Sequence, residues 1–181
     1  MDFMAKHGIK GVIGGGSGEG GALPRVIHAY RDALARAGRE TAPGTDLSIG
    51  FHFYMARTQA QGMQEAAGYY EENLKMFGPL RLVRALTDQQ IEAMADPTKA
   101  PHAGLPTIEG AVKGGAFLCG PAEQIIEQLM QLEAAYPGLE RINVAHPVGT
   151  PQSVILEQLQ QFAEEVMPAF THRVTETVVG D

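Results

Sequence analysis

The stretch that most restricts the fold is Leu47–Met55, whose nine residues read LSIGFHFYM. It is almost continuously apolar and aromatic, without the alternation that would leave one face to water. Such a run is typical of a strand covered on both faces. Two shorter apolar runs, Ile9–Ile13 and Arg141–Ala145, are also predicted as strands of this kind.

Amphipathic helices accompany these strands, because apolar residues recur there at spacings of three and four. The predicted helices are Pro24–Ala37, Gln59–Phe77, Pro121–Tyr136 and Pro151–Met167. Gly38 suits a left-handed cap, and Gly78-Pro79 closes the second helix. Three strand-then-helix units in sequence favour an α/β fold with a parallel sheet.

The segment Leu80–Gly115 is less regular. Thr87 and Gln90 have the spacing of a capping box, which predicts a short helix to Ala95. Prolines then interrupt the chain, which is typical of a binding loop or lid, although a surface connection fits equally well. Because three parallel strands leave unpaired edges, we expect something else to cover the sheet.

Composition excludes several classes of protein. The chain has 181 residues, with 14 basic and 21 acidic side chains and no basic block, which excludes nucleic acid and anionic membranes as partners. No apolar run reaches membrane-spanning length, and we expect a cytoplasmic protein.

The single Cys119 cannot form an internal disulfide and is interpreted as a small buried hydrophobe. No histidine spacing predicts a metal site.

The octet Gly14–Gly21 reads GGGSGEGG and lies between a predicted strand and a predicted helix. It formally contains G-x-G-x-x-G, which would indicate dinucleotide binding, but six glycines in eight residues match that pattern easily. No lysine followed by serine or threonine comes after it, so a P-loop is excluded. A flexible surface turn remains the alternative.

Several segments resemble the C-terminal part of the bacterial-luciferase-like flavin monooxygenases. They are AKHGIKGVIGG (Ala5–Gly15), YRDALARAGR (Tyr30–Arg39), GFHFYMARTQAQ (Gly50–Gln61), FLCGPAEQIIEQL (Phe117–Leu129) and TPQSVILEQLQQFAEEVMPAF (Thr150–Phe170). The resemblance implies one luciferase-like portion over residues 1–170 and a tail over 171–181. It implies a partial (β/α)8 barrel, with about the last three βα units and a long lid-bearing loop between the last two.

A complete barrel takes about 250 residues, so this chain is expected to be a fragment, an open half-barrel or a chain that associates with another copy or another protein. The resemblance implies an enzyme that oxygenates a small organic substrate with O2 and reduced FMN, or a deazaflavin, supplied by a flavin reductase. The alternatives are a non-catalytic flavin-binding or assembly half-barrel and a small dinucleotide-binding oxidoreductase.

The implied site lies at the carboxyl ends of the strands. There the glycine loop would approach the flavin or its phosphate through Gly14, Gly15, Gly16 and Ser17. His52 and Tyr54 share one face of their strand, so His52 is the candidate catalytic proton carrier and Tyr54 a candidate substrate contact. Arg57 and His146 follow strand ends and are further candidates for substrate binding. A packed histidine and tyrosine, and a solvated arginine, are the alternatives.

Overall fold

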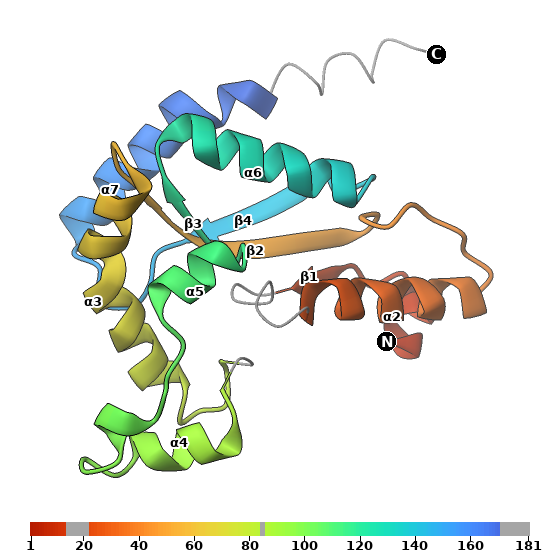
Figure 1. The fold of residues 1–181 in the computed structure, drawn as a ribbon. Coiled ribbons are helices and arrows are strands. Elements are labelled where there is room, and N and C mark those ends of the chain that lie inside the picture. Colours follow the sequence, from red (N-terminus) through yellow and green to blue (C-terminus); the bar gives the residue numbers. More distant parts are fainter. Residues whose placement is uncertain (14–21, 84–85, 171–181) are drawn as a thin grey trace.

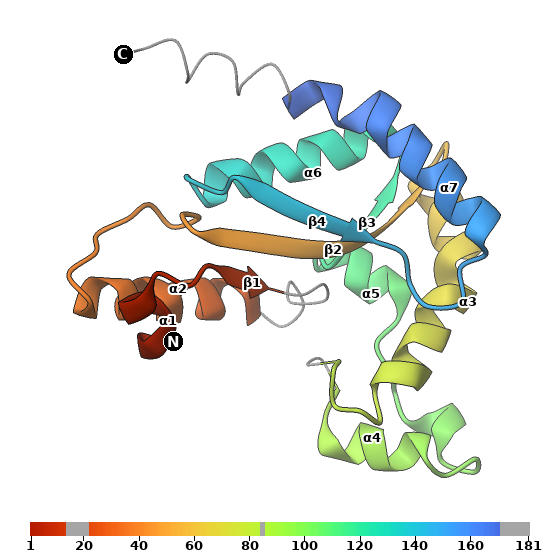
Figure 2. The same cartoon turned by 180° about the vertical axis from the view of Figure 1, so that it is seen from behind.

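The computed structural model describes residues 1–13, 22–83 and 86–170. The predicted glycine loop and the tail 171–181 therefore lie outside the described residues. Four parallel strands form one sheet within the described part (Figures 1 and 2). They are β1 (Gly11–Ile13), β2 (Leu47–Met55), β3 (Phe117–Gly120) and β4 (Arg141–Ala145). The parallel α/β class predicted from the sequence is confirmed, whereas β3 was not predicted.

The helices include those that the apolar periodicity predicts, with small shifts at their ends. Their bounds are α1 (Asp2–His7), α2 (Ala22–Arg36), α3 (Gln59–Phe77), α4 (Asp88–Met94), α5 (Ile108–Lys113), α6 (Ala122–Ala135) and α7 (Gln152–Gln161). A 3-10 turn, η2 (Ala100–His102), precedes α5, and a π-helical turn, η3 (Phe162–Val166), continues α7. None of the helices in the described ranges is long and apolar enough to cross a bilayer.

Strand β2 is the centre of the sheet. β1 pairs with its first residues, as far as Ile49, and β3 pairs with its last four, from His52 onward. β4 pairs with residues 48–52 of β2 and overlaps both of those registers. Since one edge of a strand holds one neighbour at a time, β4 must lie along the edge opposite to β1 and β3.

One face of the sheet carries the larger core. Alternate residues of β2 point into it, namely Leu47, Ile49, Phe51, Phe53 and Met55. α2, α6 and η3 cover this face with their apolar sides, for example through Leu34, Ile125 and Val166, which are at most 1% exposed. Burial of these side chains is the main stabilising contribution of the fold.

The opposite face is covered only toward the carboxyl ends of the strands. There Tyr54, Phe117 and Cys119 pack against α3 and α5 in a second core. Periodicity predicts that α3 has a buried side but cannot tell which face of the sheet it covers. In the structure α3 packs on the face opposite to α2.

The other half of that face is open, and we call it the open face. It consists of Val12, Ser48, Gly50, Arg141, Asn143 and Ala145, bordered by His52. Val12 is 72% exposed, and alternate residues of β4 are exposed while their neighbours are half-buried. The prediction that these strands are covered on both faces was therefore wrong, because no described helix packs over this half.

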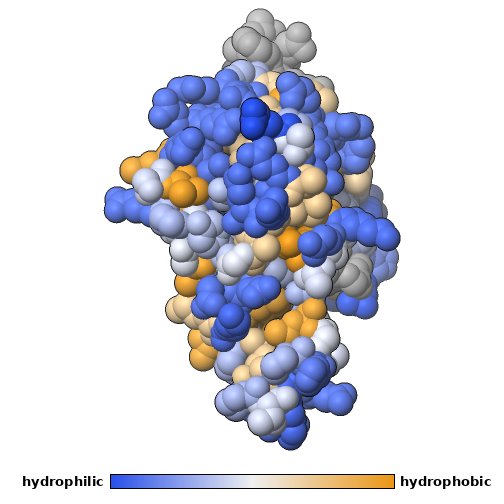
Figure 3. Space-filling view, turned by 60° about the vertical axis from the view of Figure 1, so that its left-hand side comes forward, coloured by the Kyte–Doolittle hydropathy of each residue, from blue (hydrophilic) through white to orange (hydrophobic). Residues whose placement is uncertain are grey.

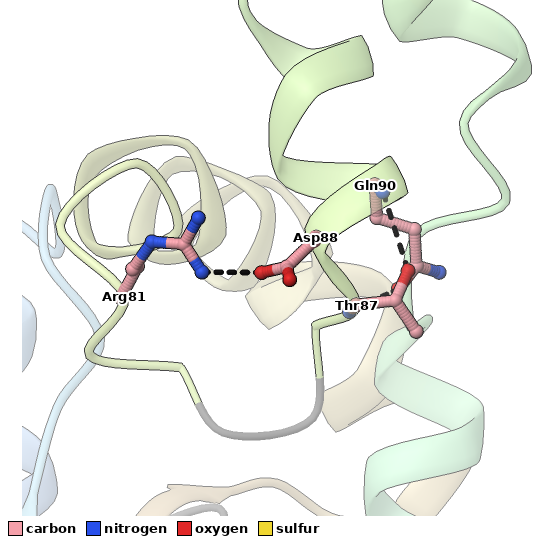
Figure 4. Close-up of polar contacts among 4 residues, drawn as sticks. All are labelled: Arg81, Thr87, Asp88 and Gln90. Carbon is pink, nitrogen blue, oxygen red and sulfur yellow. Dashed lines mark hydrogen bonds and ion pairs between the residues drawn. The ribbon is translucent and has the colours of Figure 1, made fainter.

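The region around α4 projects away from the sheet (Figure 1), and on the face drawn in Figure 3 apolar patches lie among hydrophilic residues. The predicted capping box is confirmed: the Gln90 backbone N–H donates to Thr87 Oγ1 at 3.2 Å, and the Thr87 N–H donates to Gln90 Oε1 at 2.9 Å (Figure 4). Arg81 also forms an ion pair with Asp88 beside it. α4 itself contains no buried residue, so polar contacts contribute much of its order.

Two glycines end helices in different ways. Gly38, after α2, has φ 76°, the left-handed conformation predicted from its place behind the helix. Gly78, after α3, has φ −58°, but a Cβ there would lie 2.6 Å from the Leu74 carbonyl oxygen and 2.8 Å from Leu86 Cδ1. The first glycine is thus required by backbone conformation and the second by close packing.

Candidate functional site

The structure places His52 and Tyr54 on one face of β2, as the strand period predicts. His52 is in register with Phe117 of β3, and Tyr54 with Cys119. His52 stands at the border between the covered half and the open face. Its ring centroid lies 6.3 Å from that of Phe117, in a tilted arrangement.

The imidazole of His52 has a lowered pKa, because burial disfavours its charged form. At neutral pH the ring is therefore neutral, and it offers one hydrogen-bond donor and one acceptor. Such a group can hold or accept a proton beside a bound molecule. The position and the electrostatics fit the predicted role, which itself stays a prediction.

Tyr54 is 7% exposed and belongs to the core beneath α3. Burial, followed by the negative charge of Glu65 and a hydrogen bond with its side chain, raises the pKa of Tyr54 to about 12. The phenol therefore keeps its proton at any physiological pH. Its surroundings are those of a packed side chain, and its predicted contact with substrate remains untested.

Arg57 is exposed just beyond the carboxyl end of β2, where the sequence predicts a cation. The next residue, Thr58, caps α3 by accepting a hydrogen bond from the Gln61 N–H at 3.2 Å. Arg57 forms no ion pair with any acid in the ranges that the structure describes. It is thus an unneutralised cation next to a helix N-terminus, an arrangement that attracts anions.

His146 packs on the other side of the sheet from His52 and Tyr54. Its ring packs against Phe53, with centroids 4.4 Å apart, and Phe53 points to the helix-covered side of β2. Both ring nitrogens are buried, and neither has a hydrogen-bond partner among the described residues. Burial and, second, the nearby His52 lower the pKa of His146. The structure therefore does not bring the four predicted side chains into one cluster.

The polar residues of the open face were not singled out from the sequence. The register aligns Ser48 with Arg141 and Gly50 with Asn143, so these positions share the face of His52. The hydroxyl of Ser48 is buried and has no hydrogen-bond partner in the described part of the chain. The alternation of residues along β2 and β4 is the signal that could have identified these positions. It was missed because both strands were interpreted as covered on both faces.

The predicted cofactor residues Gly14, Gly15, Gly16 and Ser17 lie outside the described residues. The chain enters this loop from the carboxyl end of β1 at Ile13 and leaves it at the start of α2. In the ranges described, no group of three or more His, Cys, Asp and Glu side chains could hold a metal ion.

Comparison with known proteins supports the fold. No family model matches the chain, and no curated protein matches its sequence. Solved structures do match it, among them the monooxygenase RslO1 from Streptomyces bottropensis, with 14% identity and a TM-score of 0.62 over 94% of this chain and 44% of that one. The predicted resemblance to luciferase-like monooxygenases is thereby confirmed at the level of the fold.

Two further structures bear on the cofactor. One is the oxygenating constituent of 3,6-diketocamphane monooxygenase from Pseudomonas putida in complex with FMN, 21% identical with a TM-score of 0.60 over 93% of this chain and 44% of that one. The other is the coenzyme F420-dependent tetrahydromethanopterin reductase from Methanopyrus kandleri, 14% identical with a TM-score of 0.53 over 94% and 49%. This chain spans less than half the length of each of these enzymes.

Proposed function

We propose that this chain forms part of a flavin- or deazaflavin-dependent monooxygenase barrel, with the open face of its sheet toward the barrel interior. The observation that carries the proposal is the one-sided covering of β1, β4 and the first half of β2 by α2, α6 and η3. In a (β/α)8 barrel the helices form the outer ring, and the other face of each strand lines the interior. The fold shared with the solved monooxygenases supports the same arrangement.

The polar side chains of the open face and the strand end match the hydrogen-bonding groups and the charge of a flavin. A flavin ring presents carbonyl and nitrogen acceptors, and its ribityl phosphate is an anion. The open face and its border offer the donors of Asn143 and neutral His52, while Arg57 is a free cation at the carboxyl end of β2. When bound, the reduced flavin would supply the electrons for activating O2.

The protein's own contribution would be positioning and proton transfer. His52 would hold or accept a proton at an imidazole nitrogen facing the bound molecules. Arg57 would bind the flavin phosphate or an anionic substrate, and the layer of α3 and α5 would keep water from one side of His52. A small organic substrate, FMN or a deazaflavin as cofactor, and a separate flavin reductase complete the proposal.

A fluorescence titration tests the cofactor site, because flavin emission changes on binding. We expect saturable binding of FMN or F420, weakened about tenfold by Arg57→Ala and by a smaller factor by His52→Gln. Arg31→Ala removes an exposed cation from α2 and should leave the affinity unchanged. Absence of binding by either cofactor, or equal effects of the Arg57 and Arg31 variants, would refute the proposed site.

An assembly half-barrel without turnover is the second candidate. The 72% exposure of Val12 in the middle of a strand favours it, because exposed strand surfaces of this kind invite another layer. Product formation from reduced FMN, O2 and a panel of small carbonyl compounds would distinguish the two. Turnover by this chain alone would support the enzyme, and flavin binding without turnover would support the half-barrel.

A further inference from the structure

A cavity lies on the helix-covered side of the sheet, away from the open face. It has a volume of about 430 Å³ and lies between α2, α5 and α6. Phe51, Leu118 and Leu129 form its apolar floor, and Lys113, Gln128 and Leu132 stand around it. We call it the α2–α6 groove. Its volume falls within the usual range for small-molecule sites.

The groove arises from a gap along one edge of β2. Among the described residues, pairing with β1 ends at Ile49 and pairing with β3 begins at His52, so Gly50 and Phe51 have no strand neighbour on that edge. The turn that joins α5 to β3 passes beside this gap at Gly115, which has φ 73°. Residues of α2, α5 and α6 line the groove beside this gap.

One cation gives the groove a definite chemistry. Gln128 also lines the groove, but its Oε1 is too deeply buried to meet a molecule bound there. Lys113, in the last turn of α5, is exposed and forms no ion pair within the described ranges.

We propose that the α2–α6 groove binds an amphiphilic organic anion. The apolar part lies on Phe51 and Leu118, and the anionic group meets Lys113. The site is separate from the flavin site, because Phe51 and His52 are neighbours on β2 and point to opposite faces of the sheet. It stands independently of the proposed enzymatic function.

The dye 1-anilinonaphthalene-8-sulfonate is the probe for this test, because it combines apolar aromatic rings with a sulfonate. Its fluorescence is titrated against the full chain. We expect one saturable site, with an affinity lowered about tenfold by Lys113→Glu, because attraction of the sulfonate becomes repulsion. Lys6→Glu makes the same change of net charge on α1 and should leave the affinity within about twofold of wild type.

A second pair of variants fills space instead of changing charge. Leu132→Trp narrows the groove and should abolish saturable binding, whereas Leu156→Trp adds the same ring to an exposed position of α7, outside the groove. Thermal melts confirm that each variant is folded. The proposal is overturned if no saturable site exists, or if Lys113→Glu and Leu132→Trp bind as their matched controls do. Competition by FMN would overturn the separation of the two sites.

Discussion

The side-chain amide of Gln158 on α7 pairs with both backbone groups of Met55 at the end of β2. Its Nε2 donates to the Met55 carbonyl at 2.9 Å, and the Met55 N–H donates to its Oε1 at 2.5 Å. β4 stops pairing with β2 at His52, so the amide takes the place of a strand neighbour beyond the end of the ladder. Gln158 is 6% exposed and thereby connects the last helix to the centre of the sheet.

Gln158→Leu should lower the free energy of unfolding by about 2 to 4 kcal/mol, because it leaves a buried donor and a buried acceptor unpaired. The measurement is urea unfolding followed by circular dichroism. Gln160→Leu is the matched control on the same helix, where the side chain is exposed and its amide donates to Glu164. Equal stability of the two variants would show that the pairing contributes nothing.

Gly62→Ala should destabilise the protein although alanine favours helices. A Cβ at this position would lie 2.7 Å from Cys119 Sγ in the core beneath α3. We expect a loss of about 1 to 3 kcal/mol in the free energy of unfolding, which Cys119→Ala in the same chain should partly restore.

Gly68→Ala is the control for that substitution. Position 68 lies on the same helix, and a Cβ there meets nothing within 4 Å. Stability should rise by about 0.5 to 1 kcal/mol, because alanine restricts the unfolded chain. A destabilisation at both positions would mean that the helix itself, and not its contact with Cys119, requires glycine.

The thiol of Cys119 should be inert in the folded protein. It is fully buried, and burial followed by the charge of Glu65 raises its pKa to about 12. Because the thiolate is the reactive form, Ellman's reagent at pH 8 should modify the protein only after denaturant is added. Rapid modification without denaturant would contradict the burial of β3.

Stability should fall in mild acid. The pKa values of His52 and His146 lie below the ordinary value for histidine, chiefly because burial disfavours the imidazolium. The unfolded chain therefore binds more protons, and the full stability is present above the ordinary pKa of about 6.5 and is lost as pH falls below it.

Urea midpoints at pH 7.5 and 5.5 measure this effect. His146→Leu should reduce the difference between the two midpoints, since it removes one of the buried rings. His102→Gln, at an exposed position of η2, should leave the difference unchanged. A midpoint that rises on acidification would refute the account.

The sequence predicts local structure well where it depends on neighbouring residues, as in helix periodicity and helix caps. The bounds Gln59–Phe77, the left-handed Gly38 and the Thr87–Gln90 capping box are all found as expected. It does not predict β3, because four wholly buried residues between a glycine turn and a proline carry no period. Nor can amphipathicity decide that α3 packs on the face opposite to α2.

The candidate site was likewise predicted only in part. The alternation of side chains along a strand predicts that His52 and Tyr54 share a face, and this is confirmed. This alternation does not apply beyond the strand end, where the ring of His146 packs against Phe53. Ser48 and Arg141 are far apart in the sequence and become neighbours only through the register of β2 and β4. That register depends on tertiary contacts.

Hydroxyl-radical footprinting of the purified chain tests the central claim, that β1, β4 and the first half of β2 carry helices on one face only. Val12 and Ile13 are adjacent on β1 but are 72% and 5% exposed. The account expects Val12 to be oxidised readily while Ile13 and Ile49 are protected. Protection of Val12 equal to that of Ile13 would contradict it, because the face assigned to the barrel interior would then already be covered.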